Sequence, residues 1–141
     1  MKREIFGVKT TAGVLLYRFR GGAVQVLLVY NGKNWSIPKG SVKRGERPRK
    51  AAKRELKEET GLHPPRGLLE LGSVRKRTGR QEKLHCFIAE YFAKAKPKGR
   101  REIVHAAFMT LANAAVLIEK FQRPLLTSLT AIQALGDPRE R

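Results

Sequence analysis

Four glutamates, Glu46, Glu55, Glu58 and Glu59, lie within fourteen residues of a strongly basic segment that holds a third of the chain's twelve acidic residues. Three of them are spaced i, i+3 and i+4, which places their side chains on one face of a helix. Like charges repel each other there, and magnesium and manganese prefer carboxylate oxygens as ligands. The spacing therefore fits a divalent-cation site. The helix alone leaves open a second interpretation, a solvated face with i,i+4 ion pairs.

The segment around these glutamates fits a longer pattern. Residues 40–62 read GSVKRGERPRKAAKRELKEETGL and match G-x5-E-x7-R-E-U-x-E-E-x-G-U, where U is a bulky aliphatic residue. The nine constrained positions are filled by Gly40, Glu46, Arg54, Glu55, Leu56, Glu58, Glu59, Gly61 and Leu62. This segment resembles the signature of the Nudix hydrolases, which cleave a nucleoside diphosphate linked to another moiety. The preceding residues 35–40, WSIPKG, resemble the same region of many family members.

The resemblance implies a role for each matched residue. Glu55, Glu58 and Glu59 match carboxylates that bind metal in the family. The backbone carbonyl of Lys39, beside Gly40, matches a further metal ligand. Glu46 matches a loop glutamate that supports the site and touches metal through water.

The resemblance also names residues that act on protons and on other side chains. Arg54 matches an arginine that orients the acids by ion pairing, for which a bidentate guanidinium is well suited. The general base varies within the family, and the candidates here are Glu55 and Glu102, of which Glu102 is also a candidate metal ligand. An ordinary surface acid is the alternative for Glu102. The implied cofactor is Mg²⁺, with Mn²⁺ as a substitute, which would lower the pKa of an attacking water.

Further candidates lie outside the signature, each with a plainer alternative. Lys39 either contacts phosphate or balances the acids, and Trp35 either flanks a base or packs in the core. Three arginines of one basic turn could hold additional phosphates, unless the turn is simply solvated; they are Arg75, Arg77 and Arg80. His85 and His105 are expected to be packed or surface residues. Cys86, the single cysteine, lies in an apolar stretch and is expected to be a buried thiol.

The composition limits the partners. The 141 residues carry 30 Lys and Arg and a formal net charge of +18, which favours polyanionic partners such as nucleotides, polyphosphates or RNA. A basic proteome is the alternative explanation. No apolar run reaches the roughly 18 residues that span a bilayer, and residues 1–5 lack the apolar part of a signal peptide. We therefore expect a cytoplasmic protein without a membrane partner, either a monomer or a homodimer.

The elements that must position these residues can be read from apolar patterns and turn residues. Strands are expected over residues 8–18, 23–30, 35–38, 68–76, 84–92 and 103–111, the first two as an antiparallel pair. Helices are expected over 48–60, 112–120 and 125–135. Pro48 fits the first turn of its helix and Gly61 its C-cap. This order predicts one α/β domain over residues 1–141. The resemblance implies a Nudix-type α/β/α sandwich with a mixed sheet, a catalytic loop–helix–loop and a C-terminal helix.

The expected function is a metal-dependent pyrophosphohydrolase, with a dinucleoside polyphosphate as the favoured substrate because of residues 35–40 and the basic excess. Alternatives in the same class are a nucleoside triphosphate, a 5′-triphosphorylated RNA or an inositol pyrophosphate. An alternative of another class is a nucleotide- or RNA-binding module on a Nudix scaffold.

Overall fold

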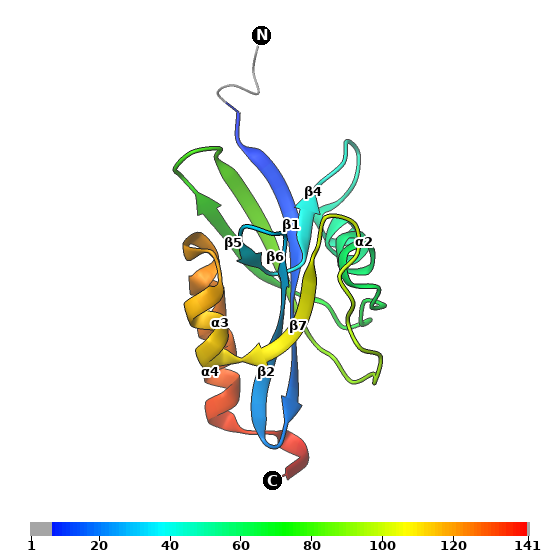
Figure 1. Ribbon diagram of the computed structural model, residues 1–141, viewed down its shortest axis with the longest axis vertical. Coiled ribbons are helices and arrows are strands. Elements are labelled where there is room, and N and C mark those ends of the chain that lie inside the picture. Colours follow the sequence, from blue (N-terminus) through cyan, green and yellow to red (C-terminus); the bar gives the residue numbers. More distant parts are fainter. Residues whose placement is uncertain (1–6, 141) are drawn as a thin grey trace.

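A mixed seven-stranded sheet forms the centre of the computed structural model, which describes residues 7–140 (Figure 1). The strands are β1 (Lys9–Arg20), β2 (Ala23–Tyr30), β3 (Trp35–Ser36), β4 (Lys39–Ser41), β5 (Leu69–Lys76), β6 (Glu82–Glu90) and β7 (His105–Thr110). The α-helices are α2 (Pro48–Thr60), α3 (Leu111–Leu117) and α4 (Leu126–Leu135), with 3₁₀ turns η1 (Lys120–Leu125) and η2 (Pro138–Glu140). The N-terminal segment considered above, residues 1–6, lies outside the described residues.

Strand β1 is the axis of the sheet. It pairs antiparallel with β2 at one end and with the short β4 further along, and it pairs parallel with β6, which places Lys9 opposite Glu82. Strands β3 and β7 both pair antiparallel with β2, and β5 pairs with β6. The predicted antiparallel pairing of the first two strands is confirmed.

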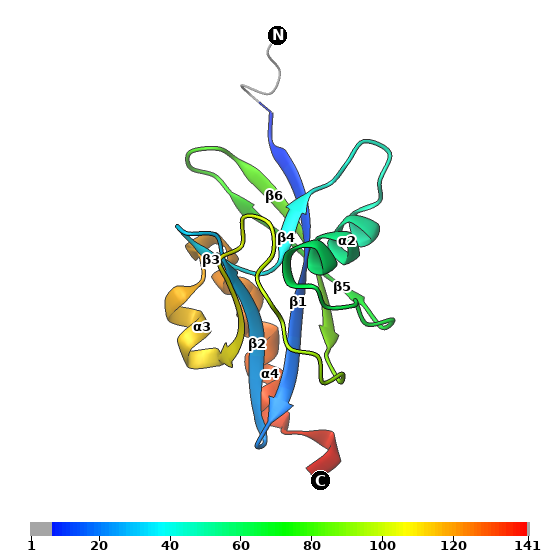
Figure 2. The ribbon, with the colours of Figure 1, turned by 45° about the vertical axis from the view of Figure 1, so that its right-hand side comes forward.

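Helices cover both faces of the sheet, which makes three layers (Figures 1 and 2). Alternate side chains of β1 enter two separate apolar cores. Val14 and Leu16 pack with Leu56 of α2, whereas Leu15 packs with Leu129 of α4. The predicted α/β/α sandwich is therefore confirmed.

Local sequence explains the helix that carries the glutamates. Pro48 occupies the first turn of α2, where a missing backbone N–H has no cost. Gly61 ends the helix with φ 76°, and its N–H donates to the carbonyl of Lys57. Ala51, Ala52 and Leu56 are fully buried against the sheet, so the opposite side of the helix keeps the charged residues.

Several element boundaries differ from the sequence expectation. The strands expected over 84–92 and 103–111 are Glu82–Glu90 and His105–Thr110, and three further differences have a structural reason. Residues 39–41 form strand β4 because they pair with β1, a contact that no local pattern reveals. The expected helix 112–120 ends at Leu117, since Ile118 turns into a bridge with Trp35. Pro124 lies within the 3₁₀ turn η1 instead of opening the last helix, which starts at Leu126. Within residues 7–140, no helix has the length and apolarity needed to span a membrane.

Candidate active site

A cavity of about 330 Å³ opens beside β4 and α2. Three of the four carboxylates in its lining are those of Glu55, Glu59 and Glu102, and Lys39 and Gly40 of β4 line it as well. The other lining residues are Lys9, Val29, Asn31, Asn34, Ser36, Ile37, Ser41, Arg101, Ile103 and Glu119. Sheet, helix and the segment before β7 thus bring together carboxylates that lie more than forty residues apart in the sequence.

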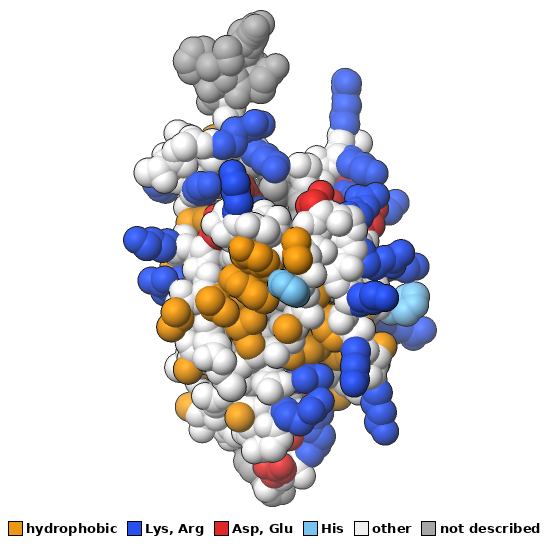
Figure 3. Space-filling view, viewed as in Figure 1, with side chains coloured by type: hydrophobic (Ala, Val, Ile, Leu, Met, Phe, Trp, Pro, Cys, Tyr) orange, Lys and Arg blue, Asp and Glu red, His pale blue; other side chains and the backbone are white. Residues whose placement is uncertain are grey.

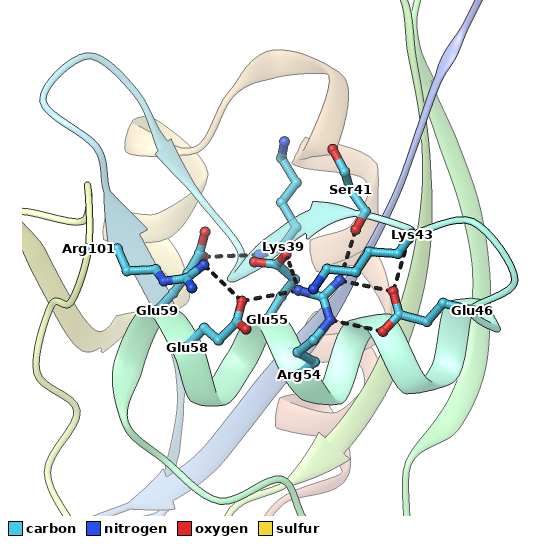
Figure 4. A network of polar contacts seen from close by, with 9 residues as sticks. All are labelled: Lys39, Ser41, Lys43, Glu46, Arg54, Glu55, Glu58, Glu59 and Arg101. Carbon is cyan, nitrogen blue, oxygen red and sulfur yellow. Dashed lines mark hydrogen bonds and ion pairs between the residues drawn. The ribbon is translucent and has the colours of Figure 1, made fainter.

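Arg54 binds three of the predicted carboxylates at once (Figure 4). Its Nε and Nη2 donate to the two oxygens of Glu46, each at 2.9 Å, in a bidentate pair. Its Nη1 donates to Glu55 at 2.9 Å and to Glu58 at 3.1 Å. A further bond runs from Nη2 to the backbone carbonyl of Ser41 at 3.0 Å. The guanidinium therefore links the loop before α2 to the face of the helix.

Glu46 is fully engaged within this network. Besides Arg54, its carboxylate accepts a hydrogen bond from the backbone N–H of Lys43 at 2.9 Å. These hydrogen bonds, that of Arg54 first, lower the pKa of Glu46 to about 2. The side chain consequently stays ionised and holds Arg54 in position.

Glu59 occupies the most enclosed position among these acids. Its side chain is buried, and its Oε1 accepts a hydrogen bond from the N–H of Lys39 at 3.2 Å. Burial, followed by the neighbouring charges of Glu55 and Glu102, raises the pKa of Glu59 to about 8. A bound cation would reduce the repulsion between this buried carboxylate and its two neighbours.

Gly40 is required by the close approach of Glu55. A Cβ on Gly40 would run into the carboxylate of Glu55, so the glutamate lies directly against the backbone of β4. This contact and the hydrogen bond from Lys39 to Glu59 place two glutamates of α2 against one short strand. The glycine at this position of the motif thus has a steric reason in this chain: a side chain at position 40 would displace Glu55.

The side chain of Lys39 points away from the glutamates of α2 (Figure 4). Its Nζ forms an ion pair of 2.8 Å with Glu82, whose carboxylate also accepts a hydrogen bond of 2.6 Å from Thr11. Burial would raise the pKa of Glu82, but Lys39 and Thr11 outweigh it and lower that pKa. Lys39 therefore balances an acid of β6, one that the sequence did not single out.

The segment before β7 is anchored to the end of α2. The N–H groups of Lys98 and Arg100 donate to the carbonyls of Thr60 and Glu59, each at 3.0 Å. Arg101, with φ 59°, forms an ion pair of 3.0 Å with Glu58. The same segment carries Glu102 to the lining of the cavity.

Several other candidates lie elsewhere. Trp35 stacks on Tyr30 with ring centroids 5.2 Å apart and is not among the residues that line the cavity. Arg75 and Arg77 line a separate shallow pocket beside η1, and Arg80 is likewise outside the cavity lining. Substrate contacts for these four residues stay predictions. Cys86 is buried as expected, and burial raises the pKa of its thiol to about 12.

Sequence reasoning missed several residues at the site. Glu82 reaches Lys39 only through the parallel pairing of β1 with β6, for which no short-range signal exists. Asn31 and Asn34 reach the cavity through a turn in which Asn31 Oδ1 accepts from the N–H of Asn34 at 2.8 Å. The Asn31–Gly32 turn was a recognisable signal for the end of β2, but it gave no sign of a cavity.

The donor set fits a hard divalent cation, although a compact site is not already assembled. Among residues 7–140, no three acidic, histidine or cysteine side chains are grouped closely enough to hold a metal ion, since Arg54 draws Glu46, Glu55 and Glu58 toward itself. The contact of Glu55 with Gly40 and the burial of Glu59 nevertheless keep two carboxylates beside one backbone segment. Carboxylate and carbonyl oxygens are the ligands that Mg²⁺ and Mn²⁺ take.

Solved structures with the same fold include several named hydrolases. A C. elegans Ap4A hydrolase binary complex aligns with a TM-score of 0.77 at 24% identity, covering 90% of this chain and 98% of that chain. RenU, a Nudix hydrolase from M. smegmatis, aligns with a TM-score of 0.69 at 25% identity, covering 88% and 86%. The NUDIX domain of Shewanella oneidensis NrtR, complexed with ADP ribose, aligns with a TM-score of 0.75 at 18% identity, covering 95% and 94%.

The family model described as the NUDIX domain matches residues 8–129, which is most of the chain and includes every residue of the cavity described above. Family members of this kind hydrolyse phosphate-containing substrates and generally require divalent metal ions. The chain belongs to the Nudix family, and it is a hydrolase that acts on phosphate-containing substrates.

Proposed function

We propose that the protein is a Mg²⁺-dependent pyrophosphohydrolase, active also with Mn²⁺, that cleaves a phosphoanhydride bond in a dinucleoside polyphosphate. The observation that carries the proposal is the convergence of Glu55, Glu59 and Glu102 on one cavity, against the backbone of Lys39 and Gly40. A basic protein that brings its scarce carboxylates together in this way has a site suited to a cation and a polyphosphate.

The proposed metal ligands are Glu55, Glu59 and the carbonyl of Lys39, with Glu58 released from Arg54 and Arg101 on binding, and with Glu102 as a further ligand where Glu55 acts as the base. Glu46 is assigned a supporting role through Arg54, because its two oxygens are already taken by the guanidinium. A bound divalent cation supplies charge neutralisation for the diphosphate oxygens and a lowered pKa for water.

The proton of the attacking water goes to a carboxylate of the cavity. Arg54 engages Glu55, whereas none of the ion pairs between described residues involves Glu102. Glu102 is therefore the freer proton acceptor, and we assign it the role of general base, with Glu55 as the alternative. Protonation of Glu102 and attack of the oxygen at phosphorus then release a phosphorylated leaving group.

The preference for a dinucleoside polyphosphate rests on two features. Residues 35–40 resemble the corresponding segment of such hydrolases, and the chain as a whole carries a formal net charge of +18. A substrate with several phosphates matches this charge better than a simple diphosphate. The fold-level similarity to an Ap4A hydrolase agrees with this choice.

A substrate panel tests the proposal. Diadenosine tetraphosphate, a nucleoside triphosphate, a 5′-triphosphorylated RNA and an inositol pyrophosphate would be incubated with Mg²⁺ or Mn²⁺ in water enriched in ¹⁸O. Mass spectrometry of the products identifies the bond cleaved and the phosphorus attacked. We expect the dinucleoside polyphosphate to have the highest kcat/KM, and a higher value for any other substrate would reject the substrate assignment while retaining the hydrolase.

A further inference from the structure

A second cavity, of about 660 Å³, lies on the α2 side of the sheet and shares no lining residue with the first. It is enclosed by the end of β1, by residues 91–97 after β6, and by β7. The lining residues are Arg18, Phe19, Arg20, Tyr91, Phe92, Ala93, Lys94, Lys96, Pro97, Ala106, Ala107 and Phe108. Nothing in the mechanism proposed above uses these residues.

The charge of this cavity is entirely positive. Arg18, Arg20, Lys94 and Lys96 line it, and no acidic residue does. None of the ion pairs found between residues 7–140 involves any of the four. Burial, followed by the charge of Arg20, lowers the pKa of Arg18, whose Nε donates a hydrogen bond of 2.9 Å to the side-chain oxygen of Gln25. Figure 3 shows Lys and Arg side chains gathered over this lower part of the molecule.

Aromatic rings form a large part of the remaining walls, beside alanines and a proline. The guanidinium of Arg18 lies 4.1 Å from the centroid of the Phe108 ring, and Tyr91 stacks on Phe108 at 5.7 Å. Phe92 is 70% exposed, which is unusual for a phenylalanine; the guanidinium of Arg139 lies 5.2 Å from the centroid of its ring, and the rest of the ring is open to a ligand. Cations hold phosphates and exposed rings stack on bases, and single-stranded nucleic-acid sites combine the two.

We propose that this cavity is an accessory binding site for a phosphorylated nucleoside, in which Lys94, Lys96 and Arg20 contact phosphate and Phe92 stacks on the base. The ligand is either a free nucleotide or a nucleotide within single-stranded RNA, since both present the same phosphate and base. The site is independent of the carboxylate cavity, so its binding requires neither a divalent cation nor a phosphoanhydride bond. A protein without hydrolytic activity should still bind a nucleotide in this cavity, and a variant that no longer binds there should still hydrolyse its substrate.

Two probes that lack a phosphoanhydride bond test the site in buffer containing EDTA: AMP and a 5′-hydroxyl decauridylate. Backbone ¹⁵N chemical shifts of the full chain would be followed during each titration. Shifts at residues 92–93 and 106–107 with AMP support the site and identify a free nucleotide as sufficient. Shifts there with the decauridylate alone support the site and identify RNA as the source. No shift there with either probe, or shifts confined to the residues of the first cavity, would overturn the proposal.

Variants then assign the contacts. Lys94→Gln with Lys96→Gln should lower the slope of log affinity against log salt for the decauridylate by about 1.4, because each phosphate contact to a single strand contributes about 0.7. The matched control, Lys120→Gln with Arg123→Gln, removes the same charge from η1 on the opposite face of the sheet and should leave the slope unchanged. An equal decrease of the slope in both double variants would mean that the RNA is attracted non-specifically by the basic surface, and it would overturn the site.

The aromatic contact has its own variant. Phe92→Ala should weaken decauridylate binding roughly fivefold or more, the range that base stacking produces. Because Phe92 is 70% exposed, the fold should be retained, which circular dichroism would check. Val116→Ala, at a position that is 79% exposed on α3, is the control and should change affinity less than twofold. Unchanged binding by Phe92→Ala would contradict base stacking at this site.

Discussion

Arg54 does more in this site than neutralise charge. One guanidinium bonds to Glu46, Glu55 and Glu58 and to the carbonyl of Ser41, and its planar fork allows these bonds to be made in fixed directions. The ammonium of a lysine is a compact charge and cannot bridge partners that lie on a loop, a strand and a helix. Position 54 therefore sets the geometry of the carboxylates.

This geometry makes a prediction for Arg54→Lys. We expect kcat to fall about 10- to 100-fold and the Mg²⁺ concentration for half-maximal rate to rise, as is usual when a residue that orients ligands is replaced. Steady-state kinetics at varied Mg²⁺ measures both quantities. Arg139→Lys is the matched control, because Arg139 also binds two carboxylates but lies away from the cavity. A rate for Arg54→Lys within twofold of the unmodified protein would refute the orienting role.

Glu59 couples the site to stability. Its pKa of about 8 in the folded chain lies above the ordinary value of 4.5, so the folded state holds a proton that the unfolded state has released between these pH values. In the absence of metal, the contribution of Glu59 to the free energy of unfolding should therefore be most favourable below pH 4.5. It should decline as the pH rises toward 8.

Glu59→Gln should remove that decline. With EDTA present, we expect the variant to exceed the unmodified protein by roughly 2–4 kcal/mol in unfolding free energy at pH 9, and by little at pH 4.5. Urea unfolding across this pH range measures the difference. Identical pH profiles for the two proteins would show that Glu59 is not a buried, destabilising charge.

At the scale of elements, the stability of helix α2 depends on the backbone conformation at its C-terminal end. Gly61 adopts φ 76°, a backbone conformation that costs residues with a side chain about 1–2 kcal/mol. A Cβ at this position would not clash with its surroundings, because it would meet only Arg100, at 3.6 Å. We expect Gly61→Ala to destabilise the fold by about 1 kcal/mol through the backbone alone. Gly67→Ala is the control, because Gly67 lacks a positive φ and its Cβ would meet nothing within 4 Å. Urea unfolding compares them, and equal effects would contradict this account of the helix end.

The sequence predicted those elements whose signals are local. Helix α2 has both limits as expected because Pro48 and Gly61 act within one turn, and its glutamates were recognised by spacing alone. Strand β4 was missed because three residues carry no periodic pattern. The 3₁₀ turn at Pro124 was missed because a proline near a helix start is compatible with either geometry.

The contacts that complete the site are non-local, and this explains what the sequence could not predict. Lys39 meets Glu82 only because β1 pairs in parallel with β6, and Arg101 meets Glu58 only because residues 98–100 dock on the end of α2. Hydrophobic alternation predicts that a strand exists but does not predict its neighbour or register. Glu82, Arg101 and Asn34 could therefore be found only after the sheet order was known.

At the scale of the whole molecule, the net charge of +18 is unevenly distributed. One cavity gathers Glu55, Glu59 and Glu102, and the other is lined by cations, aromatic rings and small apolar residues, with no acidic residue. The two cavities share no residue, so a polyphosphate reaction and an accessory nucleotide contact can occur on one molecule without competing for side chains. The basic excess by itself would have predicted only the second.

The most direct test of the central claim compares Glu59→Gln with Glu70→Gln, an exposed residue of β5 that lies outside the cavity lining. Initial rates would be measured with saturating Mg²⁺ on whichever phosphoanhydride of the substrate panel the unmodified protein cleaves fastest. We expect Glu59→Gln to lower kcat/KM at least 100-fold and Glu70→Gln to stay within twofold of the unmodified protein. Wild-type activity in Glu59→Gln, or an equal loss in both variants, would contradict the assignment of this cavity as the hydrolytic site.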